Sequence, residues 1–170
     1  MKKDISTSNH LFDAIFGPTK NNSKSFLINN DGQTSYLKFH KMINQLANAL
    51  IEKGMKVLEV GTGSGYQTAV LLELGAKVYS IERQRELFQS AKVNLSKLNY
   101  RANLFFGDGY IGKEAFAPFD RIIVTCGAPF IPEELINQLA PNGIMIVPVG
   151  EGVNQTMILI EKSENEEIIK

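Results

Sequence analysis

The chain has 170 residues, of which 44% are hydrophobic and 21% charged, and this composition is typical of one globular domain with its own buried core. Lys and Arg number 18 and Asp and Glu also number 18, so no net charge favours nucleic acid or an anionic membrane as a partner. The single cysteine, Cys126, excludes an intrachain disulfide and a cysteine-rich zinc site. No apolar run approaches the roughly 20 residues of a membrane-spanning helix, and the basic start Met1-Lys2-Lys3 lacks the apolar stretch of a signal peptide. We therefore expect a cytoplasmic monomer without a bound metal, a membrane contact or a nucleic-acid partner.

The first part of the chain differs in character from the rest. Residues 10–16 carry apolar side chains at helical spacing, and Phe26-Leu27-Ile28 is a short strand candidate followed by strong turn chemistry in Asn29-Asn30-Asp31-Gly32. Ser35 can cap a helix over Tyr36–Glu52. We expect two units, an N-terminal helical and hairpin segment over residues 1–53 and a second domain over residues 54–170.

Apolar runs alternate with amphipathic stretches from Lys56 onward. Strands are expected at Lys56–Val60, Lys77–Ile81, Ala102–Phe106, Asp120–Thr125, Ile144–Val149 and Gln155–Glu161, and helices at Gly65–Leu74, Arg83–Leu98 and Pro132–Leu139. This alternation predicts an α/β fold of the Rossmann-like kind, a mostly parallel sheet with helices on both faces. The Gly152-Val153-Asn154 connection is too short for a crossover, which places an antiparallel strand at one edge. Pro141-Asn142-Gly143 is expected to be a turn, and the charged tail Lys162–Lys170 to be frayed.

A glycine-rich loop, Gly61-Thr62-Gly63-Ser64-Gly65, follows the first of these strands and opens a helix. Gly61 allows a sharp turn, and Gly63 lets the backbone approach a ligand without an intervening side chain. Such a loop indicates a nucleotide site only when other features support it.

Glu82 is the first supporting feature, at the end of the second strand and 21 positions after Gly61. A carboxylate at this spacing can accept hydrogen bonds from both hydroxyls of an adenosine ribose. The alternative is a solvated Glu at the start of a helix, where the helix dipole favours negative charge. The spacing favours the ribose role.

The second feature is Gly107-Asp108-Gly109, directly after the third strand. This loop belongs to the same carboxyl edge of the sheet as Glu82, where open α/β sheets bind their ligands. Asp108 can accept a hydrogen bond from an adenine amino group, although an Asp-Gly pair is also common in ordinary turns. The shared edge favours the ligand role.

The third feature is Tyr66, which occupies the position where a dinucleotide fingerprint has a small residue. A tyrosine there separates the helix from the strand, and the chain has no room for a second mononucleotide half, so NAD is disfavoured. The sequence also has no Gly-x-x-x-x-Gly-Lys-Ser/Thr loop, which excludes a P-loop.

The same residues resemble the protein-L-isoaspartate O-methyltransferase family over about residues 54–162. The resemblance rests on Val57–Leu74, Val78–Leu87, Gly107-Asp108-Gly109-Tyr110, Ala117–Thr125, Ala128-Pro129, Ile131-Pro132-Glu133 and Val147–Thr156, and Tyr66-Gln67-Thr68 is its most specific part. It implies S-adenosylmethionine as the methyl donor and the carboxylate of an isoaspartyl residue in a damaged protein as the acceptor, which is a protein-repair reaction. The cofactor-binding residues that it implies are Glu59, Gly61, Thr62, Gly63, Ser64, Gly65, Glu82, Arg83, Gly107, Asp108, Gly109 and Thr125.

Methyl transfer to a carboxylate needs no general base, because that carboxylate is already ionised near neutral pH. The lack of a catalytic triad or metal cluster in the sequence is therefore compatible with an enzyme. Cys126 follows the fourth strand and is expected to be a small buried residue, in preference to a nucleophile. Thr125 and Cys126-Gly127-Ala128 are candidates for the border of the acceptor site.

The acceptor side is where the resemblance weakens. The family has a Gly-Gln-Thr-Ile-Ser-Gln-Pro segment whose serine is assigned to the active site, and this chain has Gly32-Gln33-Thr34-Ser35-Tyr36. Ser35 is thus the catalytic candidate, although helix capping is the favoured role from the residues alone. Residues 9–54 also resemble the N-terminus of a malonyl- or acyl-CoA synthetase. The alternative function is an S-adenosylmethionine-binding module that lacks turnover because its acceptor-binding region is replaced.

Overall fold

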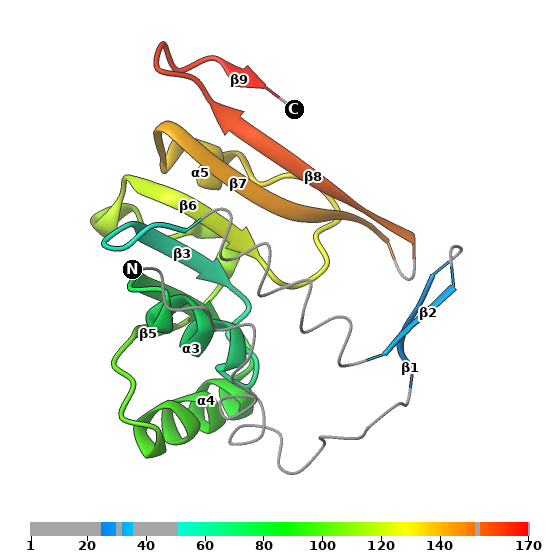
Figure 1. Ribbon diagram of the computed structural model, residues 1–170. Helices are drawn as coiled ribbons and strands as arrows, with labels where there is room; N and C mark the ends of the chain where they lie inside the picture. The colour runs from blue at the N-terminus through cyan, green and yellow to red at the C-terminus, as the bar shows by residue number, and fades with distance from the viewer. Residues whose placement is uncertain (1–24, 30–31, 36–50, 152–153, 170) are drawn as a thin grey trace.

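The computed structural model describes residues 25–29, 32–35, 51–151 and 154–169. Its larger sheet has seven strands in the order β5-β4-β3-β6-β7-β8-β9 (Figure 1). These strands are β3 (Lys56–Val60), β4 (Lys77–Glu82), β5 (Asn103–Phe106), β6 (Phe119–Val124), β7 (Leu139–Glu151), β8 (Asn154–Lys162) and β9 (Ile168–Ile169). The helices are α3 (Tyr66–Glu73), α4 (Arg85–Lys97) and α5 (Glu133–Asn137), with short 3-10 helices η2 (Gly109–Ile111) and η3 (Glu114–Phe116).

The pairing of the strands confirms the predicted α/β fold. Strands β3 to β7 pair in parallel, whereas β8 and β9 are antiparallel additions at one edge. The chain moves from β3 outward to β4 and β5, and then returns to place β6 on the other side of β3. Such a reversal of strand order opens a crevice beyond the carboxyl ends of the two central strands, where α/β proteins bind ligands.

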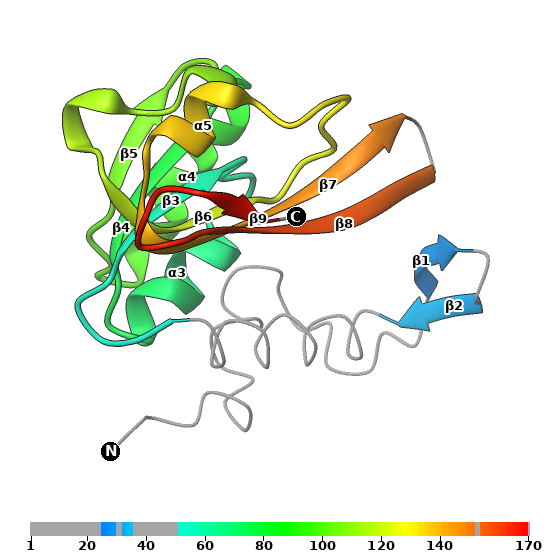
Figure 2. The same cartoon turned by 90° about the horizontal axis from the view of Figure 1, so that it is seen from above.

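Alternating side chains of β3 point into two separate layers of core. Leu58 packs in a buried cluster with Leu135 of α5, whereas Val57 packs in another cluster with Leu71 of α3. Figure 2 shows α3 and α5 on opposite sides of the sheet. Helix α4 joins the α3 layer through Leu95. The central strand is therefore covered on both faces, as its apolar residues Val57, Leu58 and Val60 predict.

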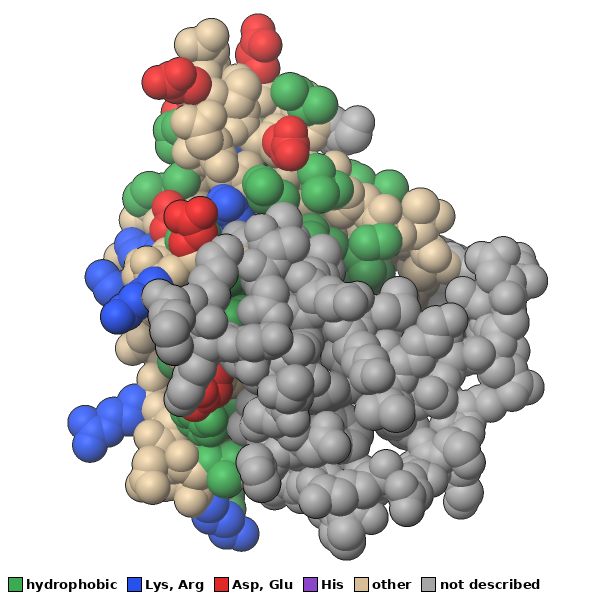
Figure 3. All heavy atoms as spheres, in the orientation of Figure 1, with side chains coloured by type: hydrophobic (Ala, Val, Ile, Leu, Met, Phe, Trp, Pro, Cys, Tyr) green, Lys and Arg blue, Asp and Glu red, His purple; other side chains and the backbone are tan. Residues whose placement is uncertain are grey.

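Two expectations for the C-terminal part are wrong in detail. The expected turn at Pro141-Asn142-Gly143 is a bulge inside β7, where the register with β6 shifts and Asn142 has a φ of 60°. The tail is not simply frayed, because β9 pairs with Glu161 and Lys162 at the end of β8. On the face drawn in Figure 3, hydrophobic side chains gather over β7 and β8, and Met157 of β8 is 62% exposed.

The N-terminal part contains a two-stranded antiparallel sheet of β1 (Ser25–Asn29) and β2 (Gly32–Ser35). It confirms the strand expected at Phe26-Leu27-Ile28 and adds a second strand that the sequence pattern did not predict. The helices expected over residues 10–16 and over most of Tyr36–Glu52 lie outside the described residues. In the part of the chain that is described, no helix is long and apolar enough to span a membrane.

Candidate functional site

A cavity of about 520 Å³ lies beyond the carboxyl ends of β3, β4 and β6. Its lining residues are Val60, Gly61, Gly63, Ile81, Glu82, Arg83, Gln84, Leu87, Asp108, Gly109, Tyr110, Thr125, Cys126, Gly127 and Pro129. Its volume falls in the ~300–1,000 Å³ range of small-molecule sites. The cavity thus occupies the crevice that the reversal of strand order creates.

Gly61 forms the tightest point of the glycine loop. Its φ of 98° favours glycine, and a Cβ atom there would lie 2.7 Å from the side-chain oxygen of Thr125. Thr125 Oγ1 donates to the backbone oxygens of Val60 and Gly61, at 3.0 and 2.5 Å. The loop is therefore fastened to the end of β6, with no space for a side chain between them.

Gly61→Ala is expected to lower the free energy of unfolding by about 2–5 kcal/mol, through left-handed backbone strain and overpacking against Thr125. Gly63→Ala is the matched control, because Gly63 also has a positive φ, 55°, but its Cβ would meet nothing within 4 Å. That control should lose only ~1–2 kcal/mol. Urea unfolding measures both values, and equal losses for the two variants would contradict the close approach.

Glu82 is 5% exposed although it lines the cavity. Its Oε2 accepts from the backbone N–H of Gly63 at 2.9 Å, and its Oε1 accepts from that of Gln84 at 2.8 Å. One carboxylate thus connects the glycine loop with the start of α4. An ionised carboxylate offers about four acceptor positions, so two accepted bonds leave it able to accept from a ligand in the cavity.

Asp108 lines the cavity from the loop after β5, where the backbone N–H of Gly107 donates to the backbone oxygen of Glu82 at 3.0 Å. Its side chain accepts from the backbone N–H of Tyr110 at 3.0 Å and caps η2, so the ordinary turn role is present. Asp108 is nevertheless exposed and lines the cavity, so the turn does not exclude a ligand role. Tyr110 also lines the cavity, and its ring stacks on Phe130 at 5.5 Å between ring centroids.

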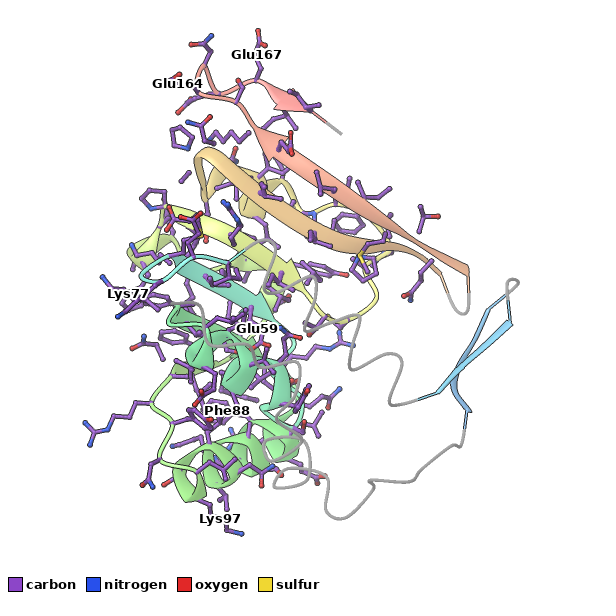
Figure 4. All side chains as sticks on the ribbon, viewed as in Figure 1. Glu59, Lys77, Phe88, Lys97, Glu164 and Glu167 are labelled. Carbon is purple, nitrogen blue, oxygen red and sulfur yellow. The ribbon has the colours of Figure 1, made fainter. Side chains whose placement is uncertain are left out.

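Glu59 lies beneath the glycine loop and does not line the cavity. Its side chain is fully buried, and Oε2 accepts from Ser80 Oγ at 2.6 Å and from Thr68 Oγ1. Figure 4 shows Glu59 in the interior, between β3 and α3. Burial raises the pKa of Glu59 from 4.5 to about 7, the bonds from Ser80 and Thr68 lower it, and the charge of Glu82 adds a smaller increase.

The expectation that Cys126 is buried is wrong, since its side chain is exposed and forms part of the cavity wall. Partial desolvation raises the pKa of its thiol, and the nearby Arg83 guanidinium opposes that shift. A raised pKa leaves the thiol protonated near neutral pH, which disfavours the nucleophile role, in agreement with the sequence-based expectation.

The cavity brings together most of the residues singled out in the sequence. Those that line it are Gly61, Gly63, Glu82, Arg83, Asp108, Gly109 and Thr125, and those that do not are Glu59, Thr62, Ser64, Gly65 and Gly107. Ser35 ends β2 on the separate small sheet, and its catalytic role stays a prediction. Leu87 of α4, Tyr110 of η2 and Pro129 also line the cavity. They were not among the cofactor candidates, because the resemblance over their segments does not say which side chains face the cavity. In the described ranges, no cluster of His, Cys, Asp and Glu could hold a metal ion.

Comparisons with known proteins identify the family to which the chain is similar. The model of the family described as protein-L-isoaspartate(D-aspartate) O-methyltransferase matches residues 11–170. The protein-L-isoaspartate O-methyltransferase of Christiangramia forsetii is 60% identical over 117 residues, which cover 68% of this chain and 55% of that protein. That of Cytophaga hutchinsonii is 42% identical over 160 residues, covering 94% of this chain and 72% of that protein. The chain therefore spans about half the length of the first relative.

Solved structures give the same result for the fold. A protein-L-isoaspartate O-methyltransferase structure has a TM-score of 0.67 at 28% identity. The match covers 94% of this chain and 57% of that chain. A Plasmodium falciparum structure in complex with S-adenosyl-L-homocysteine has a TM-score of 0.69 at 24% identity, with 92% of this chain and 79% of that chain covered. The family match begins at residue 11 and so takes in the segment expected to resemble an acyl-CoA synthetase. The chain belongs to the protein-L-isoaspartate (D-aspartate) O-methyltransferase family.

Proposed function

We propose that this chain transfers a methyl group from S-adenosylmethionine to the carboxylate of L-isoaspartyl residues in damaged proteins. The observation that carries the proposal is the cavity at the carboxyl edge of the sheet, which is lined by the buried Glu82 and by Gly61 and Gly63 of the glycine loop. Family membership supports both the donor and the acceptor.

The residues around the cavity fit S-adenosylmethionine. At Gly61 and Gly63 the backbone borders the cavity without a side chain, which suits the methionine end of the donor. Glu82 retains acceptor positions for the ribose hydroxyls, and Asp108 lies on the neighbouring loop after β5 for the adenine. Tyr110, which stacks on Phe130, adds an aromatic ring to the cavity lining. Glu59, Thr62 and Gly65 would act on the donor only through the position of the loop.

S-adenosylmethionine supplies a methyl group on a positively charged sulfur, and the methyl carbon exchanges its bond to sulfur for a bond to the carboxylate oxygen. No proton moves, so the protein needs to align donor and acceptor and to exclude water from them. Alignment alone accounts for ~7–11 kcal/mol of barrier lowering in well-oriented reactions. Thr125, Cys126 and Gly127 border the cavity at the end of β6, and we assign them to its acceptor side.

We assign the N-terminal segment to binding of the acceptor peptide. We propose that residues 1–53 bind the peptide, with Ser35 beside the isoaspartyl carboxylate, and that residues 54–170 form the donor-binding domain. Because the family match includes this segment from residue 11, nothing favours the alternative of a binding module without turnover. We also propose that the protein acts in the cytoplasm as a monomer.

A thermal-shift measurement with S-adenosylhomocysteine tests donor binding. A ligand that binds only the folded state at about 100 times its Kd should raise the melting temperature by ~5–10 °C for a chain of this size. Methionine at the same concentration is the control, because it lacks the adenosine that we assign to Glu82 and Asp108. An unchanged melting temperature with S-adenosylhomocysteine would contradict the proposal.

A further inference from the structure

Glu59 and Thr62 are predicted cofactor-binding residues that do not line the cavity. Both are buried. Thr62 is 3% exposed and lies between Gly61 and Gly63, which both line the cavity. Its hydroxyl lies 2.6 Å from Ser80 Oγ on β4, inside the protein. The side chain of Thr62 is therefore directed away from any ligand while its backbone neighbours face one.

The direction of the hydrogen bonds in this cluster follows from proton counting. Ser80 donates its one hydroxyl proton to Glu59 Oε2 at 2.6 Å, so it accepts from Thr62. Thr68 of α3 donates to the same carboxylate oxygen. The carboxyl of Glu59 thus ends a chain of hydroxyls that begins in the glycine loop.

The loop has further anchors besides this cluster: Thr125 donates to the backbone oxygen of Gly61, and the backbone N–H of Gly63 donates to Glu82 Oε2 at 2.9 Å. The Glu82 anchor uses the carboxylate that faces the cavity and would also contact a ligand. The side chains of Thr62, Ser80 and Glu59 are all buried, and none of the three residues lines the cavity. This cluster can hold the loop independently of what Glu82 contacts.

We propose that Glu59 is a positioning residue, which holds Thr62 inward through Ser80 and thereby fixes the backbone of residues 61–65 in the geometry that binds the donor. The effect on donor binding rests on the proposed function, whereas the effect on the loop itself does not. Glu59 touches no ligand in this account, in contrast to the direct contact that the family resemblance implies.

Thr62→Val and Thr68→Val form a matched pair that tests the proposal. Each removes one buried hydroxyl from the Glu59 cluster with little change of volume, but only Thr62 belongs to the loop. Amide hydrogen exchange should become about tenfold faster over residues 61–65 in Thr62→Val, the effect of losing one hydrogen bond, and stay unchanged there in Thr68→Val. Thr62→Ser should restore slow exchange.

Calorimetry with S-adenosylhomocysteine supplies the second readout. Thr62→Val should weaken binding about tenfold, while Thr68→Val and Thr62→Ser stay within about twofold of the unaltered protein. Equal exchange and equal affinity in the two valine variants would overturn the positioning role. If the unaltered protein binds no S-adenosylhomocysteine, the proposed function fails, and the exchange data still decide whether the loop depends on this cluster.

Discussion

Glu82→Ala is expected to weaken S-adenosylhomocysteine binding about 100-fold or more, measured as the Kd in calorimetry. The substitution removes the acceptor of the Gly63 and Gln84 amides and the carboxylate that we assign to the ribose. Hydrogen bonds to a charged group each contribute ~1.5–3 kcal/mol, and two of them account for a change of this size.

Glu86→Ala is the matched control for this substitution. Glu86 lies in the first turn of α4, carries the same charge and is exposed, and it does not line the cavity. Its loss should change the Kd by less than about twofold, because an isolated surface charge has little effect at this distance. A Kd for Glu82→Ala within about threefold of the unaltered protein would remove Glu82 from the ligand site.

Glu59→Gln is expected to change how the stability of the protein depends on pH. The pKa of Glu59 is raised from 4.5 to about 7 in the folded state, mainly by burial. A raised carboxyl pKa means that the folded state holds its proton more tightly than the unfolded state. The stabilisation is complete below about pH 4.5 and is lost as the pH rises through about 7.

The size of the effect follows from the difference between the folded and unfolded pKa values of Glu59. Each tenfold difference in proton affinity between the two states corresponds to ~1.4 kcal/mol. Between pH 4.5 and pH 8, the free energy of unfolding of the unaltered protein should therefore fall by about 3 kcal/mol relative to that of Glu59→Gln. Urea unfolding of both proteins across this range measures the difference, and the titration of all other groups cancels. Parallel curves would show that Glu59 titrates normally and that its burial does not raise its pKa.

The regular parts of the fold were predictable from the sequence, because their signals are local. The mostly apolar run Lys56–Val60 and the glycines that follow it predict both ends of β3 correctly. The start of β7 was not predictable, since Pro141-Asn142-Gly143 has the chemistry of a turn and forms a bulge held by pairing with β6. Strand β9 was missed for a related reason, because its pairing depends on backbone contacts with β8 and not on its own composition.

The candidate site divides in the same way. The sequence could single out Gly61, Gly63 and Glu82, which line the cavity, because their spacing reflects a strand, a turn and a neighbouring strand. Glu59 was also among the predicted cofactor residues, but it is buried and does not line the cavity. The motif gives the order of the residues and not the face of the strand on which each side chain lies. Alternation along β3 predicts that Val57 and Leu58 face opposite sides of the sheet. Which layer each side chain enters is decided by the packing of α3 and α5.

The most direct test of the proposed activity is methyl transfer from labelled S-adenosylmethionine to two peptides that differ only in one linkage. One peptide contains an L-isoaspartyl residue and the other a normal aspartyl residue at the same position. We expect a base-labile methyl ester on the isoaspartyl peptide, and none on the aspartyl peptide. The absence of ester on the isoaspartyl peptide at high protein concentration, with S-adenosylhomocysteine still bound, would contradict a methyltransferase activity toward isoaspartyl residues.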